Sequence, residues 1–337
     1  MRIARAPEAL RGPWRGRHRR AVAGAGWLCV PWVFQAAHAC APFADADANA
    51  AIGSAAQLAQ GGLLMEGLHR RLGEIRQVMP VRDVGGEVFM RNVHGMFEHV
   101  GGFHAARSRA AALQLGGNVA YWNDGGAHQR AGWALDRGTL RVRPGRTTGI
   151  DNDMRGLAAW YTRHGENGAY VDAGIRRASG TGRARGVAKI RTGQWTLSAE
   201  AGAPLPLGDN LVVEPQVQLT YQSLRTRVAR GIGTIRTRQA TARLGVRIAR
   251  IDNERFVPYL QAELERQFAG RSRAAPAGAS SVDAAAVRNG SALRLSTGLT
   301  IKVHRTVDVY AHAGVQRRLV GGGSTGGSFG AGLRINF

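Results

Sequence analysis

Two short motifs in the sequence have residue types and spacings that could support chemistry. Gly322-Gly323-Ser324-Thr325-Gly326 matches G-x-S-x-G, the pattern around the nucleophile of many serine hydrolases. Such a nucleophile needs a strand before it and a helix after it. A glycine-rich turn leading into an alternating C-terminal strand is expected here instead, so we expect no nucleophile at Ser324.

The second motif is Asp151-Asn152-Asp153, which resembles the start of a calcium-binding loop, with Gly156 at the sixth position. However, Arg155 and Thr162 occupy the fifth and twelfth positions, where the metal needs oxygen ligands and a bidentate glutamate. We therefore expect an ordinary surface loop. The histidines and cysteines show no zinc-binding spacing either. The sequence predicts no catalytic residue, no metal site and no cofactor, and hence no enzyme.

The formal net charge of +23 raises the possibility of a nucleic-acid partner. The positive charge is almost all arginine, since Lys189 and Lys302 are the only lysines, and it is spread along the chain. A nucleic-acid module gathers its charge on one face or interleaves it with stacking aromatics. We expect no nucleic-acid partner, and attribute the charge to a basic pore lining and an arginine-rich coding bias.

The first forty residues predict an export signal. Seven arginines precede residue 21, an apolar stretch runs from Ala21 to Phe34, and Ala37-His38-Ala39 fits a cleavage site. Residues 1–39 are therefore predicted to be a signal peptide, followed by a polar spacer or vestigial passenger at 40–51. Lipidation of Cys40 stays open as an alternative. The mature chain then has at most one cysteine and no internal disulfide.

A helix is predicted from Ile52 to Val78, with Pro80 as its stop. Leucines 64, 68 and 72 and Ile75 recur at spacings of four, four and three, which is typical of one helix face. An amphipathic helix on a soluble core is the alternative. Arg71 falls on the apolar side, where a soluble core would tolerate it poorly.

After Gly85 the apolar residues follow a period of two, which indicates strands. Between Val213 and Gln222, Val217 and Leu219 lie on one face and Glu214 and Gln216 on the other. This pattern predicts an all-β fold. The twelve expected strands lie near residues 86–94, 110–122, 128–142, 155–163, 168–178, 187–202, 211–223, 239–251, 256–266, 291–302, 307–317 and 328–337.

The expected connections are short after even-numbered strands and mostly longer after odd-numbered ones, notably Leu224–Arg238 and Gln267–Gly290. Short turns on one side and long loops on the other are typical of outer-membrane barrels. The chain has no run of 18 apolar residues, and lipid allows only helices and closed barrels to span it. We predict a 12-stranded antiparallel transmembrane β-barrel at 81–337, with an N-terminal α-helix at 52–80 threading its lumen.

Several segments resemble the translocator domains of autotransporters, the type V secretion class, and of their pertactin-like branch in particular. The segments are Gly67–Arg76, which is similar to the family's pore helix, Phe89-Met90-Arg91, Gly156–Tyr161 with Gly168–Ala173, Leu197–Gly202 with Val213–Gln216, Val257–Leu260, and the terminal Phe337.

The resemblance implies a monomeric barrel in the outer membrane of a Gram-negative bacterium. Its lumen would guide an N-terminal passenger to the cell surface. The implied partners are outer-membrane lipid, periplasmic chaperones and the barrel-assembly machinery, which would recognise Phe337. The implied pore-helix residues are Leu68, Arg70, Arg71, Leu72 and Arg76. The lumen-facing residues are Glu214, Gln216, Arg243, Arg247, Glu263, Arg294 and Arg334.

Inward charges are less costly when paired, so we expect Arg70, Arg71 or Arg76 to pair with Glu214 or Glu263. One subgroup of the family cuts its own helix at an Asn-Asn pair. Glu66-Gly67 stands at that place here, so this self-cleavage is not expected. The alternative function is a passenger-less outer-membrane pore, or a surface adhesin acting through its loops.

Overall fold

The computed structural model describes residues 53–73, 86–101, 104–144, 149–184, 188–228, 233–251, 253, 255–275, 282–283 and 290–337. The predicted signal peptide, the predicted spacer and Arg76 lie outside these residues.

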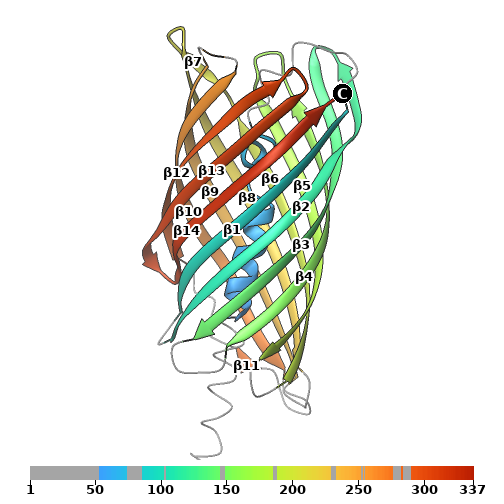
Figure 1. Cartoon of the computed structure of the whole chain (residues 1–337). Coiled ribbons are helices and arrows are strands. Elements are labelled where there is room, and N and C mark those ends of the chain that lie inside the picture. Colours follow the sequence, from blue (N-terminus) through green and yellow to red (C-terminus); the bar gives the residue numbers. More distant parts are fainter. Residues whose placement is uncertain are drawn as a thin grey trace, which may run out of the picture. The chain divides into compact units, whose positions relative to one another are not determined.

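Twelve long antiparallel strands form a closed ring (Figure 1). They are β1 (Glu87–Gly101), β2 (His104–Asp124), β3 (Ala127–Pro144), β4 (Ile150–His164), β5 (Tyr170–Ala184), β6 (Ala188–Gly202), β8 (Leu211–Val228), β9 (Gly233–Arg250), β10 (Phe256–Ala275), β12 (Gly290–His304), β13 (Val307–Gly321) and β14 (Gly323–Asn336). Two short strands, β7 (Leu205–Leu207) and β11 (Val282–Asp283), pair at the ends of β8 and β10.

The ring closes where the first and last strands pair, from Glu87 opposite Asn336 to Val100 opposite Gly323. The residues that flank these two strands reinforce the seam, since Gly86 and Phe337 exchange two backbone hydrogen bonds of 2.8 and 2.9 Å. A closed ring leaves no long strand edge unpaired. The prediction of a 12-stranded antiparallel barrel is confirmed.

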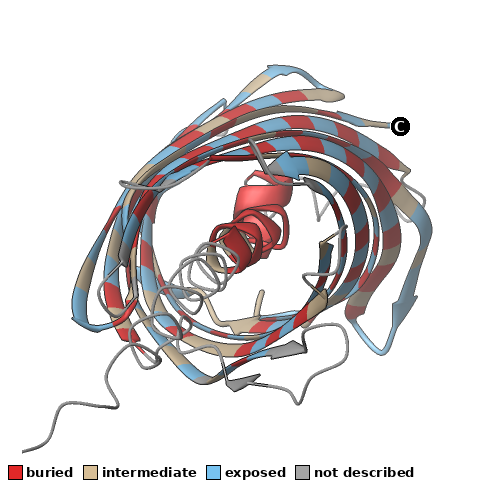
Figure 2. Ribbon diagram, turned by 90° about the horizontal axis from the view of Figure 1, so that it is seen from below, coloured by how far each residue is buried: buried red, intermediate tan, exposed pale blue. Residues whose placement is uncertain are grey.

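Side chains along each strand alternate between the lumen and the outer surface (Figure 2). In β8 the polar Glu214 and Gln218 are buried inside, whereas Val217 and Leu219 are exposed outside. Polar groups inside and apolar groups outside reverse the arrangement of a soluble protein. This is the pattern that lipid requires of a barrel surface.

Several strands are longer than the sequence predicts, so the expected contrast in loop length is largely wrong. Most of the expected loop Leu224–Arg238 belongs to β8 and β9, which leave only residues 229–232 between them. The period of two continues there, with Leu224 and Thr226 inside, but the outward positions hold arginines. Without apolar residues on the outer face, these strand ends resemble loops in sequence.

The two motifs considered for chemistry also lie in strands. Asp151-Asn152-Asp153 is part of β4, so the surface-loop interpretation is wrong. Ser324 lies in β14 and not in a turn, and its side chain is buried inside the barrel.

The chain inside the barrel is helical at residues 53–64 and again in α2 (Leu68–Leu72). The prediction of one unbroken helix is therefore wrong within the described residues. Gly67 precedes α2, and Gly73 ends it with a φ of 73°, a left-handed conformation that favours glycine. The backbone N–H of Leu68 donates to the Glu200 carboxylate at 3.2 Å instead of continuing the first helix.

These lumenal residues run from one rim of the barrel towards the other. We call the rim with Gly86 and Phe337 the C-terminal rim and the opposite one the far rim. Gly53 contacts Ile150, where β4 begins at the far rim, and Gly73 contacts Tyr310 near the C-terminal rim. No helix among the described residues is long and apolar enough to cross a membrane.

Candidate functional site: the barrel lumen and the chain within it

The apolar residues of α2 pack against one side of the barrel wall. Leu68 and Leu72 are fully buried in a cluster that includes Phe89, Ala134 and Trp160. Because the other strands that face α2 present carboxylates such as Asp172, Glu214 and Glu263, this apolar patch on β1, β3 and β4 fixes which way the short helix faces. Its charged residues then point at other strands.

Arg70 extends towards β10 and β12. Its guanidinium lies 2.5 Å from the Glu263 carboxylate and 2.9 Å from the Ser296 hydroxyl, and a longer contact of 3.4 Å reaches Glu66. Both Arg70 and Glu263 are buried. One of the expected pairings between α2 and the wall is therefore present in the geometry.

Arg71 extends the other way, towards β5. Its guanidinium donates two hydrogen bonds to Asp172, at 2.6 and 3.2 Å, and lies 4.6 Å above the Trp160 ring. Asp172 also accepts a hydrogen bond from Thr162. Sequence reasoning missed Asp172. The alternation of β5, which turns Tyr170 and Asp172 to the same side, could have identified it.

Glu214, the other carboxylate expected to meet the helix, contacts α2 at His69. Its carboxylate lies 2.9 Å from the ring nitrogen Nε2 of His69 and also accepts from Gln216. His69 packs edge-on against Tyr170. The three residues of α2 between its leucines thus reach different strands: His69 contacts β5 and β8, Arg70 contacts β10 and β12, and Arg71 contacts β5.

Arg91 on β1 holds the backbone around the helix break, and sequence reasoning gave it no such role. Its guanidinium donates to the carbonyl oxygen of Leu64 at 2.8 Å and to that of Arg70 at 3.1 Å. The ends of both helical segments would otherwise leave carbonyl groups unpaired in a buried place. Arg91 therefore stabilises the interruption between them.

The remaining wall residues selected from the sequence also face the lumen. Arg243 bridges Glu200 and Glu263 at 3.0 and 3.1 Å. The other placements are Arg294 3.0 Å from Glu66, Arg247 4.4 Å above the Tyr259 ring, Arg334 2.8 Å from Asp308, Gln216 accepting from Gln261, and Phe337 exposed at the C-terminal rim.

Residues 53–64 contact the wall in a different way, because they include no charged residue. Ala56 and Leu63 join an apolar cluster with Phe97, Leu140 and Ile150 towards the far rim. Polar contacts from the wall reach the helix backbone, as when Gln222 donates to the Leu58 carbonyl at 2.9 Å.

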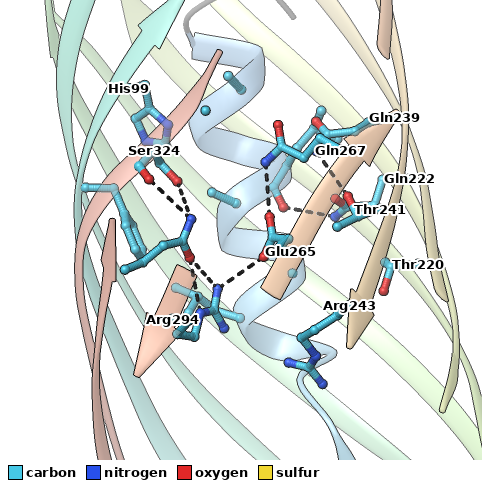
Figure 3. A pocket seen from close by; sticks show the side chains of 18 of the residues that line it. His99, Thr220, Gln222, Gln239, Thr241, Arg243, Glu265, Gln267, Arg294 and Ser324 are labelled. Carbon is cyan, nitrogen blue, oxygen red and sulfur yellow. Dashed lines mark hydrogen bonds and ion pairs between the residues drawn. The ribbon is translucent and has the colours of Figure 1, made fainter. Parts of the chain in front are cut away.

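A polar cavity of about 110 Å³ lies beside this segment, between it and strands β8 to β14 (Figure 3). Gln222, Gln239 and Thr241 line one side, and Arg294 and Glu265 the other. His99 of β1 also lines the cavity, so the helix leaves room for several water molecules on the side of the lumen between β8 and β1. Among the described residues, no group of acidic, histidine or cysteine side chains is arranged to hold a metal ion.

Comparison with known proteins relates this architecture to one family. Residues 88–314, about two thirds of the chain, match the family model described as autotransporter beta-domain. No curated protein sequence matches the chain.

Three solved structures have a similar fold. The translocator domain of NalP from Neisseria meningitidis is 14% identical with a TM-score of 0.63, over 85% of this chain and 97% of that one. The Bordetella BrkA β-domain is 18% identical (TM-score 0.59), over 75% of this chain and 100% of that one. The transport unit of AIDA-I from Escherichia coli is 15% identical (TM-score 0.59), over 86% and 99%.

Proposed function

Since the chain belongs to the autotransporter β-domain family, whose barrels are outer-membrane translocators, we propose that this barrel displays or exports the polypeptide preceding residue 53 at the cell surface. Translocator barrels are transport domains and not enzymes. The observation that supports the proposal is the direction of the lumenal chain. It runs from Gly53 at the far rim to Gly73 near the C-terminal rim, which supports exit of the preceding polypeptide at the far rim.

The finer organisation belongs to the same proposal. Residues 1–39 would be removed as a signal peptide, 40–51 would be the short displayed segment, 52–80 the linker and 81–337 the barrel. The barrel would act as a monomer, delivered by periplasmic chaperones. The barrel-assembly machinery would bind Phe337, whose side chain is exposed. Membership of the pertactin-like branch stays a prediction.

A surface-accessibility experiment tests this orientation. An epitope tag is inserted between residues 45 and 46, and intact cells are treated with an external protease. We expect the tag to be cut in intact cells. The matched control carries the same tag at Asp209, in the turn between β7 and β8 at the C-terminal rim, and should be cut only after the outer membrane is permeabilised.

The opposite pattern, with the first tag protected and the Asp209 tag cut, would mean that the barrel has the reverse orientation in the membrane. Protection of both tags in a correctly folded barrel would favour the alternative function, a pore without a displayed segment. The cavity beside residues 53–64 is the observation that supports this alternative, because a pore needs open space in the lumen. Folding is checked by comparing gel migration of unheated and boiled samples, because a closed barrel migrates differently before heating.

A further inference from the structure

The outer surface of β5, β6, β8 and β9 changes character towards the far rim. Along β8 the outward positions are apolar from Leu211 to Tyr221. After Ser223, towards the far rim, the outward positions hold Arg225 and Arg227. The other three strands change in the same way. Six outward-facing arginines of these strands lie around one hollow, and we call them the arginine belt: Arg177, Arg191, Arg225, Arg227, Arg236 and Arg238.

The belt lies just beyond the stretch that the hydrocarbon core can cover. Ten residue steps separate Leu211 from Tyr221, or roughly 33 Å along a strand. With the usual strand tilt this becomes a height of about 25 Å, the height of the apolar band of an outer-membrane barrel. Arg225 and Arg227 are four and six residues further on, so their guanidinium groups are at the level of lipid headgroups.

The positions of the belt residues leave a concentrated positive charge. Arg191 lies directly opposite Arg227 across the β6–β8 pair, and Arg225 directly opposite Arg236 across the β8–β9 pair. Like charges at opposed positions destabilise a sheet. The acidic residues of these four strands are Asp172, Glu200 and Glu214, and all three are buried inside the barrel. The described residues of these four strands therefore offer the belt no outward carboxylate.

The six arginines also line a shallow hollow of about 510 Å³ on the outside of the barrel. Trp195, which is exposed, lies at its membrane side, and the Arg177 guanidinium stacks 4.8 Å from its ring. Tryptophan at this depth is typical of the boundary between hydrocarbon and headgroups. The outward positions between the arginines are the small residues Ser179, Gly193 and Ser223. The hollow thus has a low floor, one aromatic side and cationic walls, which suits a phosphorylated headgroup beside its acyl chain.

We propose that the arginine belt binds the phosphate groups of membrane lipids in the leaflet at the far rim. Each guanidinium can hold a phosphate through two parallel hydrogen bonds, and two phosphates on one headgroup would neutralise both opposed arginine pairs. A soluble polyanion would find the same charge. The belt, however, faces sideways and continues the lipid-covered surface of the same strands, so we favour a lipid.

The test titrates the purified full-length protein in nonionic detergent with lipid A carrying two phosphates, and counts bound lipid by native mass spectrometry. The variant Arg225→Gln/Arg227→Gln/Arg236→Gln should bind about tenfold more weakly. The control variant Arg163→Gln/Arg255→Gln/Arg305→Gln removes equal charge from exposed positions near the C-terminal rim, and should stay within about twofold of the parent protein. Lipid A with one phosphate should bind the parent protein less tightly.

Equal losses in both triple variants, or equal binding of lipid A with and without phosphate, would overturn the proposal. So would charge-dependent binding of heparin to the barrel in phosphatidylcholine vesicles together with unchanged lipid A binding. If the belt variant fails to show heat-modifiable migration, the double variant Arg225→Gln/Arg236→Gln replaces it, with an expected loss of about threefold. None of these outcomes depends on whether an N-terminal segment is displayed.

Discussion

Residues 53–64 and α2 follow each other through the same lumen, but the barrel wall contacts them with different chemistry. The first segment has no charged side chain and packs through small and apolar residues beside a cavity. In α2, Arg70 and Arg71 reach carboxylates on two separate strands, β10 and β5. A chain that moves through a pore needs few directional contacts, whereas a chain that stays needs several. We infer that α2 is the anchor and that residues 53–64 are the more easily displaced part.

The largest loss of stability, and so the sharpest test of the difference between α2 and residues 53–64, is expected from a substitution at Arg71. Arg71→Met leaves the buried carboxylate of Asp172 with only the Thr162 hydroxyl in place of a guanidinium. Removing one partner of a buried ion pair typically costs about 3–5 kcal/mol of folding free energy. Urea unfolding in detergent, followed by the mobility of unheated samples, measures the loss.

The control is Arg163→Met, the same change at an exposed position of β4, where we expect less than about 0.5 kcal/mol. Equal losses of stability at Arg71 and Arg163 would mean that the contact of Arg71 with the wall does not anchor α2.

A smaller effect is expected from the two glutamates that the sequence singled out. Glu263 lies within 3.1 Å of two guanidinium groups, those of Arg70 and Arg243, whereas Glu214 lies 2.9 Å from the ring nitrogen Nε2 of His69. Glu263→Gln, which weakens both ion pairs, should therefore lower the free energy of unfolding by about 1.5–3 kcal/mol. Glu214→Gln, which weakens the hydrogen bond with His69, should lower it by about 0.5–1.5 kcal/mol.

Single-channel recordings in planar bilayers provide the second measurement for this pair, because a loosened α2 should open the lumen more often. Unchanged stability and unchanged conductance in both variants would mean that these carboxylates do not anchor the helix.

The smallest effects are expected in the first segment, where adjacent glycines differ in their surroundings. A methyl group at Gly62 would meet no atom within 4 Å, so Gly62→Ala should stabilise the protein by about 0.5–1 kcal/mol through the helix preference of alanine. At Gly61 a methyl carbon would lie 2.1 Å from the buried Gln194 amide. Gly61→Ala should therefore destabilise the barrel in the same urea titration. A gain from both substitutions would indicate that this segment is not held against the wall at all.

The fold could be predicted from the sequence because lipid imposes a simple rule on the strands. In the middle of the strands, apolar and polar residues alternate clearly, and each of the twelve strands overlaps the range that this alternation predicts. The prediction was wrong at strand ends such as Arg225 and Arg236. Outward positions must be apolar only where hydrocarbon covers them, and these residues lie beyond the hydrocarbon core. The early end of the helix was also missed, although Gly67 and Gly73 are the residues that end it.

The lumenal contacts were harder to predict. Alternation places Glu214 and Glu263 inside the barrel, but it does not say which part of the helix each one meets. That depends on strand register and on the rotation of α2, which Leu68, Leu72 and Trp160 set together. Asp172 and Arg91 were missed for the same reason, since their partners lie far away in the sequence.

The seam between β1 and β14 has a consequence for how the molecule is made. Synthesis is vectorial, so β1 leaves the ribosome first among the strands and its neighbour β14 leaves last. Until then β1 can pair only with β2, and its other edge is a template for wrong partners. The barrel can therefore close only after the last strand has been synthesised. During the delay, β1 presents an unpaired edge to its surroundings.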